Sequence, residues 1–120
     1  MRARNKEVEH GITPVLLTAP SSHRRGAEPP HLAERYVNDL RDMVPLHQAY
    51  AAAVRAVAAQ TDTPLVDLYA EFNRLPEEEL NKLFESDGVH LTEAGDRKIA
   101  ASLYQHLARY GLIERLIKKD

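Results

Sequence analysis

The chain has 120 residues, about the length of one domain, and its 43% hydrophobic and 28% charged residues are typical of a globular protein. The net charge of −2 argues against nucleic acid or an anionic membrane as a partner. Cysteine is absent, which excludes disulfides, thiolate metal sites and a cysteine nucleophile. No apolar run is long enough to span a bilayer, and no signal-peptide core follows the charged start at residues 1–7. These features do not indicate a particular cellular compartment.

Two continuous apolar runs predict strands, at about residues 14–19 and 64–69, which read PVLLTA and PLVDLY. Runs of this kind are typical of strands buried on both faces of a parallel sheet. Residues 21–45 begin as a polar loop over the end of the first strand, and 31–43 are expected to form a partial helix. A helix then follows, because apolar residues recur at helical spacing at Leu46, Tyr50, Ala53, Val54, Val57 and Ala58. Strand, helix and strand predict a right-handed parallel crossover.

Further helices are expected in the C-terminal half. Pro76 followed by three glutamates is typical of a helix start. The last long helix is predicted to begin at an N-cap, Thr92, and to end at Gly111, with an amphipathic tail at 112–117. Its apolar stripe consists of Ala94, Ile99, Ala100, Leu103, Tyr104 and Leu107. Tyr50 and Tyr104 lie on the two helical stripes and are therefore expected in the core.

The segment from Ser86 to Gly95, SDGVHLTEAG, is the most informative stretch of the chain. It places a carboxylate, Asp87, three residues before an imidazole, His90, in a turn that leads into a helix. A catalytic histidine needs an acceptor on its second ring nitrogen to fix its tautomer and stabilise the imidazolium. Asp87 and His90 are therefore the candidate catalytic pair. The alternative is a simple Asp-Gly turn with His90 as a surface residue.

Two parallel strands with three or four helices make a poor independent domain, because such sheets typically contain more strands. One edge of the strand pair would remain without a partner. Residues 7–13 are typical of a helix end with a glycine C-cap rather than of a domain start. The chain is therefore expected to be the last portion of a larger α/β sheet.

The order of these segments resembles the SGNH/GDSL hydrolases, a family of esterases and acylhydrolases. The resemblance rests on a strand ending in Thr-Ala-Pro, an Ala-rich helix, the strand at 64–69 and the block Asp-Gly-Val-His-Leu-Thr-Glu-Ala-Gly. It implies that residues 1–120 are the C-terminal portion of such a domain, with an α/β fold that is part of a three-layer flavodoxin-like sandwich. It also implies that Asp87 orients His90, and that His90 is the general base of a Ser-His-Asp triad.

Other blocks of the family are missing. The chain has no Gly-Asp-Ser nucleophile block, no oxyanion-hole glycine and no Gly-x-Asn-Asp block. Ser21 and Ser22 follow a strand end, where catalytic groups gather in open α/β sheets, and are the only candidates for a nucleophile within the chain. The resemblance implies ester hydrolysis by the complete domain, with the isolated chain not competent. The alternative is a non-catalytic binding or interaction module that uses the open sheet edge.

Arg24 and Arg25 are candidate substrate-binding residues, because paired arginines after this strand resemble the carbohydrate acetylesterases of the family; a solvated loop is the alternative. The expected substrate is a small-molecule or carbohydrate ester. The histidines lack metal-ligand spacing, so neither a metal nor a cofactor is expected. The unpaired strand edge predicts self-association or a complementing N-terminal segment.

Overall fold

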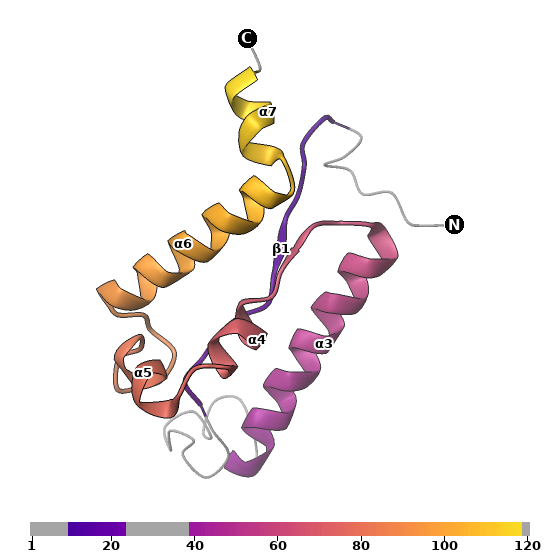
Figure 1. The fold of residues 1–120 in the computed structure, drawn as a ribbon. Helices are drawn as coiled ribbons and strands as arrows, with labels where there is room; N and C mark the ends of the chain where they lie inside the picture. The colour runs from indigo at the N-terminus through magenta and orange to yellow at the C-terminus, as the bar shows by residue number, and fades with distance from the viewer. Residues whose placement is uncertain (1–9, 24–38, 119–120) are drawn as a thin grey trace.

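The computed structural model describes residues 10–23 and 39–118 of the chain, and Figure 1 shows their arrangement. Arg24, Arg25 and most of the helix expected at 31–43 lie outside these residues. The described part has mixed α/β content, as predicted. Its elements are β1 (Leu16–Leu17), the 3-10 helix η1 (Leu40–Asp42), α3 (Met43–Thr61), β2 (Leu65–Val66), α4 (Leu68–Asn73), α5 (Glu77–Lys82), α6 (Glu93–Arg109) and α7 (Leu112–Lys118).

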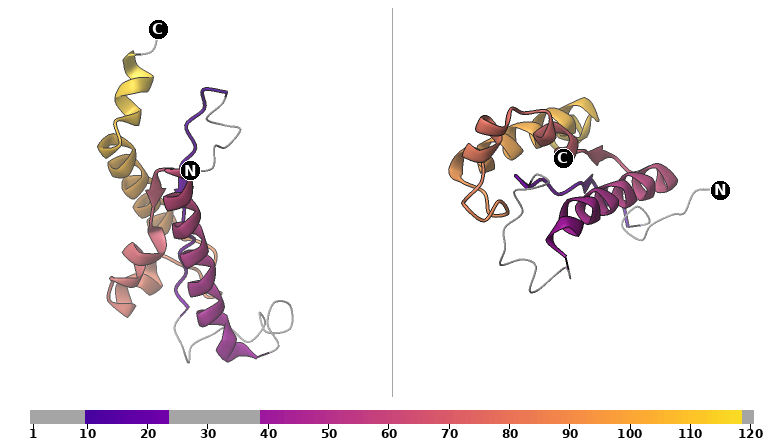
Figure 2. Two further views of the ribbon diagram at one scale, coloured as in Figure 1. Left: turned by 90° about the vertical axis from the view of Figure 1, so that its right-hand side faces the viewer. Right: turned by 90° about the horizontal axis from the view of Figure 1, so that it is seen from below.

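The two strands are parallel and adjacent, as the crossover pattern predicts. Leu16 lies opposite Leu65, and Leu17 lies opposite Val66. The backbone N–H of Leu16 donates to the carbonyl of Pro64 at 2.9 Å, one residue before β2. Helices α3 and α6 lie on opposite sides of the strand pair (Figures 1 and 2). Within the described residues, no helix is both long and apolar enough to cross a membrane.

Both strands are shorter than the predicted 14–19 and 64–69, and the expectation of strand structure up to residue 69 is wrong. β2 ends at Val66, and Asp67 is the N-cap of α4, where its side chain accepts from the backbone N–H of Ala70 at 3.2 Å. An aspartate that caps the backbone in this way competes with the strand ladder. Leu68 and Phe72, four residues apart, are then buried on one face of α4.

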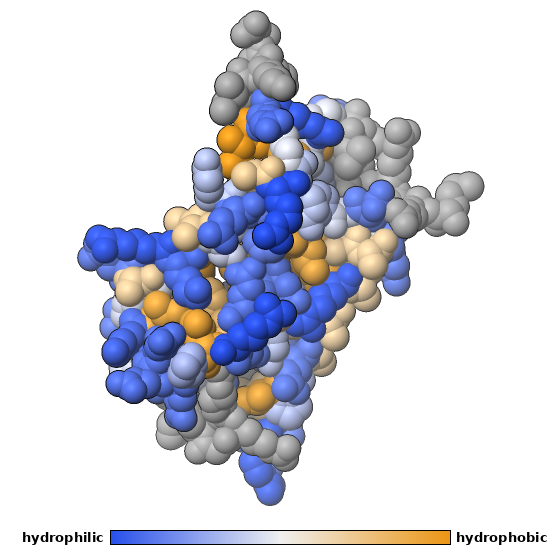
Figure 3. Space-filling view, in the orientation of Figure 1, coloured by the Kyte–Doolittle hydropathy of each residue, from blue (hydrophilic) through white to orange (hydrophobic). Residues whose placement is uncertain are grey.

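Helix α3 forms where it was predicted, but only part of its predicted apolar stripe faces inward: Ala58 is buried and Val54 is half-buried. Ala51 and Ala58 are its buried residues, whereas Tyr50 and Val57 are exposed. Small alanine side chains let the helix lie close to the strands, whereas Tyr50 and Val57 stay largely uncovered by the described elements. The expectation that Tyr50 and Tyr104 belong to the core is therefore wrong. Figure 3 shows that apolar side chains reach the surface between charged ones on the face it displays.

The hydrophobic core lies between β2, α4, α5 and the α6 helix. Its buried members are Val66, Leu68, Phe72, Leu80 and Phe84. The rings of Phe72 and Phe84 meet edge to face, with centroids 5.8 Å apart. The α6 stripe contributes Ile99 and Leu103 to this cluster, as its spacing predicts. The core therefore fixes the start of α6, directly after the turn that contains Asp87.

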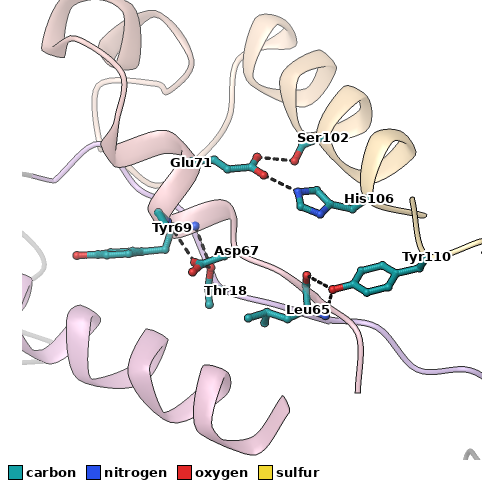
Figure 4. Close-up of polar contacts among 9 residues, drawn as sticks. Thr18, Leu65, Asp67, Tyr69, Glu71, Ser102, His106 and Tyr110 are labelled. Carbon is teal, nitrogen blue, oxygen red and sulfur yellow. Dashed lines mark hydrogen bonds and ion pairs between the residues drawn. The ribbon is translucent and has the colours of Figure 1, made fainter. Parts of the chain in front are cut away.

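The carboxylate of Asp67 joins three parts of the fold. Arg55 of α3 donates to it through Nε at 2.7 Å and Nη2 at 3.1 Å. Thr18, which follows β1 and is fully buried, donates its hydroxyl to Oδ1 at 2.7 Å. The same hydroxyl accepts from the backbone N–H of Tyr69 at 2.9 Å (Figure 4). Partial burial raises the pKa of Asp67, but the hydrogen bonds from Arg55, Thr18 and Ala70 outweigh it, so the pKa lies below its ordinary value.

Replacing Asp67 should therefore destabilise the fold. We expect Asp67→Asn to lower the free energy of unfolding by about 1–3 kcal/mol at pH 7, because Arg55 loses its ionised partner. The native pKa is depressed, so this stabilisation is present above the unfolded pKa of about 4 and is lost as the pH falls through the native pKa. Urea unfolding of both proteins at several pH values measures the difference.

Asp42→Asn is the matched control, because Asp42 is exposed and its side chain makes no capping hydrogen bond to α3. It should leave stability within about 0.5 kcal/mol of wild type. An equal loss in both variants, or a loss in Asp67→Asn that stays the same down to the lowest pH at which the wild type remains folded, would contradict the role of the Asp67 carboxylate.

Candidate active site

The segment between α5 and α6 is a tight turn closed by backbone hydrogen bonds. The N–H of Glu85 donates to the carbonyl of His90 at 2.7 Å, and Phe84 forms an antiparallel bridge with Leu91. Thr92 caps α6, as predicted: its hydroxyl accepts from the N–H of Gly95 at 3.2 Å and donates to the carbonyl of Lys82 at 2.8 Å. The turn is thus held at both ends, by the end of α5 and by the start of α6.

Within this turn, Asp87 and His90 are paired. Oδ1 of Asp87 accepts from the backbone N–H groups of Val89 and His90, each at 2.9 Å. Its other oxygen, Oδ2, is hydrogen-bonded to Nδ1 of the His90 ring. A carboxylate can only accept, so Nδ1 carries the proton, and this fixes the tautomer of the neutral ring. The sequence therefore predicts the contact between the two residues correctly.

The electrostatics of the pair follow from this contact. The hydrogen bond from the His90 ring, with those from the backbone of Val89 and His90, holds the pKa of Asp87 below its ordinary value. In turn, the hydrogen bond to Asp87 and its negative charge raise the pKa of His90. The His90 side chain is 78% exposed, and its Nε2 makes no hydrogen bond to any residue that the structure describes. Nε2 is thus open to an external proton donor.

Two glycines make this geometry accessible. Gly88 has φ +72, in the left-handed region, and a Cβ there would lie 2.5 Å from Cδ2 of His23 and 2.8 Å from Oγ of Ser22. A Cβ at Gly95 would lie 2.1 Å from the carbonyl oxygen of Leu83. The first glycine lets the loop after β1 lie against the turn, and the second lets α6 start close to α5.

The loop after β1 packs directly on the Asp87 turn. The N–H of Ser22 donates to the carbonyl of Gly88 at 3.1 Å, and Nε2 of His23 donates to the carbonyl of Asp87 at 2.9 Å. The carboxyl end of β1 and the candidate catalytic pair therefore share one edge of the molecule, where open α/β folds place their ligands. No serine hydroxyl of the described segments is hydrogen-bonded to His90. The Ser21 hydroxyl instead lies 3.2 Å from Nδ1 of His47.

A second histidine–carboxylate contact joins α4 to α6. Glu71 accepts from the hydroxyl of Ser102 at 2.5 Å, and its Oε1 lies 2.6 Å from Nε2 of His106 (Figure 4). Burial raises the pKa of Glu71, but these two hydrogen bonds outweigh it and lower the pKa. The carboxylate stands between the hydroxyl and the imidazole, so His106 does not accept the proton of Ser102. The i, i+4 spacing of Ser102 and His106 is the sequence signal for this cluster.

No protein-family model matches the chain, and neither does any curated protein or solved structure. In residues 10–23 and 39–118, no group of three or more His, Asp or Glu side chains could hold a metal ion.

Adding one methyl group at Gly88 tests the packing of the turn. We expect Gly88→Ala to cost more stability than Gly111→Ala. Both residues have positive φ, but a Cβ at Gly111 meets nothing within 4 Å. Left-handed backbone strain of about 1 kcal/mol applies to both, and the clash with Ser22 and His23 adds to it at Gly88 alone. Chemical denaturation of the two variants measures the difference, and equal losses would contradict the close approach of the loop.

Removing the charge of Asp87 tests the electrostatics of the pair. We expect Asp87→Asn to lower the pKa of His90, because both the hydrogen bond and the charge of the carboxylate raise it. The ring proton resonances of His90, followed by NMR between pH 4 and pH 9, report this pKa directly. Asp96→Asn, which removes an exposed carboxylate from α6, is the control and should leave the His90 titration in place. An unchanged titration in Asp87→Asn would contradict the contact.

Proposed function

We propose that this chain is the C-terminal portion of an SGNH-type hydrolase domain and supplies the general base for hydrolysis of an ester. The observation that carries the proposal is the contact between Oδ2 of Asp87 and Nδ1 of His90, which leaves Nε2 exposed at the carboxyl end of the strands. A histidine oriented by a carboxylate on one nitrogen and open on the other is the arrangement that Ser-His-Asp catalysis requires.

In this proposal the nucleophilic serine and the oxyanion-hole donors come from the N-terminal portion of the domain. The serine attacks the ester carbonyl while Nε2 of His90 accepts its proton. Asp87 stabilises the resulting imidazolium, which then donates the proton to the leaving alcohol. Water hydrolyses the acyl intermediate by the same route. The raised pKa of His90 is consistent with a base whose protonated form is stabilised by its neighbour.

The fold proposed for the complete domain is the three-layer flavodoxin-like sandwich, of which the described residues supply two strands. The position of α3 and α6 on opposite sides of the strand pair supports this proposal. The substrate class is a small-molecule or carbohydrate ester, and Arg24 and Arg25 are proposed to contact it. A complementing N-terminal segment, or a second copy of the chain, would pair with the edge of β1.

One observation favours a second candidate function, a non-catalytic module that binds a partner through its open sheet edge. Leu17 on β1, with Leu46, Tyr50 and Val57 on α3, exposes more than a third of its surface. Exposed apolar groups beside an unpaired strand are typical of a contact surface. The same exposure is expected where the rest of a hydrolase domain would pack, so activity experiments must separate the two functions.

The isolated chain should not turn over ester. Loss of the nucleophile alone costs a serine hydrolase roughly 10⁶-fold in kcat, which leaves no measurable steady-state rate. We therefore expect the steady-state rate of p-nitrophenyl acetate hydrolysis with the 120-residue chain to equal the rate in buffer alone. Sustained turnover that vanishes in His90→Ala would contradict the proposed division of the site.

A chimera tests the function itself. The N-terminal portion of an SGNH esterase, with its Gly-Asp-Ser and oxyanion blocks, is joined before Thr13 so that this chain supplies the only Asp-x-x-His block. We expect the folded chimera to hydrolyse p-nitrophenyl acetate and to lose at least about 10³-fold in kcat in His90→Ala.

His106→Ala in the same chimera is the matched control, because His106 also contacts a carboxylate but belongs to the cluster that joins α4 and α6. This variant should lower the stability of the chimera but leave the rate of the chemical step unchanged. A folded chimera whose activity is indifferent to His90, or one that is inactive but binds a partner through β1, would favour the non-catalytic function.

A further inference from the structure

The imidazole of His47 on α3 contacts a serine hydroxyl. Oγ of Ser21 lies 3.2 Å from Nδ1 of His47, and Nε2 of the same ring lies 2.7 Å from the carbonyl oxygen of Ala19. A carbonyl can only accept, so Nε2 carries the proton and Nδ1 presents its lone pair. Ser21 must therefore donate its hydroxyl proton to His47.

This is the arrangement of an activated nucleophile: a hydroxyl, a base within hydrogen-bond reach, and a third group that orients the base. The carbonyl of Ala19 takes the orienting role that a carboxylate has in a Ser-His-Asp triad. Burial lowers the pKa of His47, and this effect exceeds the opposing hydrogen bond to Ala19, so the ring stays neutral at pH 7. The His47 ring also makes a T-shaped contact with the Tyr69 ring, with centroids 4.8 Å apart, which restricts its orientation further.

The position of the pair agrees with a reactive role. Ser21 lies just beyond β1, in the loop that packs on the Asp87 turn, and so at the carboxyl end of the strands. Ser21 is 8% exposed, so a reagent must reach its hydroxyl through the small part of the residue's surface that remains open.

We propose that Ser21 is a nucleophile with His47 as its own general base, and that it accepts a small acyl group from an activated ester. A bond forms between Oγ and the acyl carbon, and the bond from that carbon to the alkoxide oxygen breaks. The proton of Ser21 passes to Nδ1 of His47 and from there to the departing alkoxide. This reaction goes beyond the proposed function, in which His90 serves a nucleophile supplied from elsewhere.

A covalent probe tests the reaction in the isolated chain. Incubation with a small alkyl fluorophosphonate should form the phosphorus–oxygen bond on Ser21 with loss of fluoride, as read by intact mass and peptide mapping. His47→Gln, whose amide can still donate to the Ala19 carbonyl, should slow the labelling by at least about tenfold, because glutamine is not a base. Labelling of another serine, no labelling, or labelling indifferent to His47→Gln would overturn the proposal.

The absence of cysteine gives a second, independent test that does not require phosphonylation. Ser21→Cys introduces the only thiol, and a neighbouring imidazole lowers the pKa of a thiol by stabilising the thiolate. The pH profile of its alkylation by iodoacetamide should have its midpoint at lower pH than that of Ser22→Cys, the matched control. Ser22 bonds to no imidazole among the described residues.

The shift should disappear when His47→Gln is combined with Ser21→Cys. Coincident profiles of the two cysteine variants would overturn the proposal by themselves, whatever the result of the labelling. Both measurements depend on His47 in the isolated chain, whereas the proposed function depends on His90 in the chimera. Failure of one is therefore distinguishable from failure of the other.

Discussion

The fold depends on how the carboxylate of Asp67 holds two strands and two helices at one point. A parallel pair of two-residue strands has too few ladder hydrogen bonds to be stable alone, since a sheet normally needs three or more strands. Asp67 adds hydrogen bonds at the place where both strands end: to Thr18 beyond β1, to Arg55 on α3 and to the first turn of α4. Because Thr18 is fully buried, the hydrogen of its hydroxyl would otherwise lack an acceptor, at a cost comparable to a lost hydrogen bond.

This junction also places the candidate site. Once the end of β1 is fixed, the loop that follows it must continue toward the turn between α5 and α6, where Gly88 leaves room for Ser22 and His23. The core residues Phe72 and Phe84 fix the same turn from the other side. The Asp87–His90 contact itself is local, but its position beside the end of β1 is a consequence of long-range packing.

The sequence predicted what depends on local chemistry. The parallel strands, the long helices and the Thr92 cap follow from periodicity and capping preferences, and the contact of Asp87 with His90 follows from their spacing in a turn. The predicted end of β2 was wrong because an aspartate such as Asp67 can either follow a strand or cap a helix. Its contacts with Thr18 and Arg55 select the helix cap. Long-range contacts of this kind leave no periodic signal.

The predicted inward face of α3 was partly wrong for a related reason. Periodicity locates an apolar stripe but does not say whether the residues present can cover it, and here the alanines, not Tyr50, meet the strands. The cluster of Glu71 with Ser102 and His106 was missed because Glu71 lies 31 and 35 residues away from the other two, whose i, i+4 spacing alone does not indicate a carboxylate partner. Only the folded arrangement of α4 against α6 brings them together.

Four imidazoles in the described residues contact oxygen atoms. Those of His106, His47 and His90 differ in what their surroundings leave the ring free to do. In His106 the contact is with a half-buried carboxylate that also accepts from Ser102, so the ring ties two helices together. In His47 a carbonyl fixes the tautomer and burial disfavours protonation, which leaves a neutral acceptor pointed at one hydroxyl. In His90 the carboxylate favours the protonated ring while the opposite nitrogen faces solvent. A base must both accept a proton and reach the group that gives it. His90 therefore fits a nucleophile that arrives from outside, and His47 fits the one already beside it.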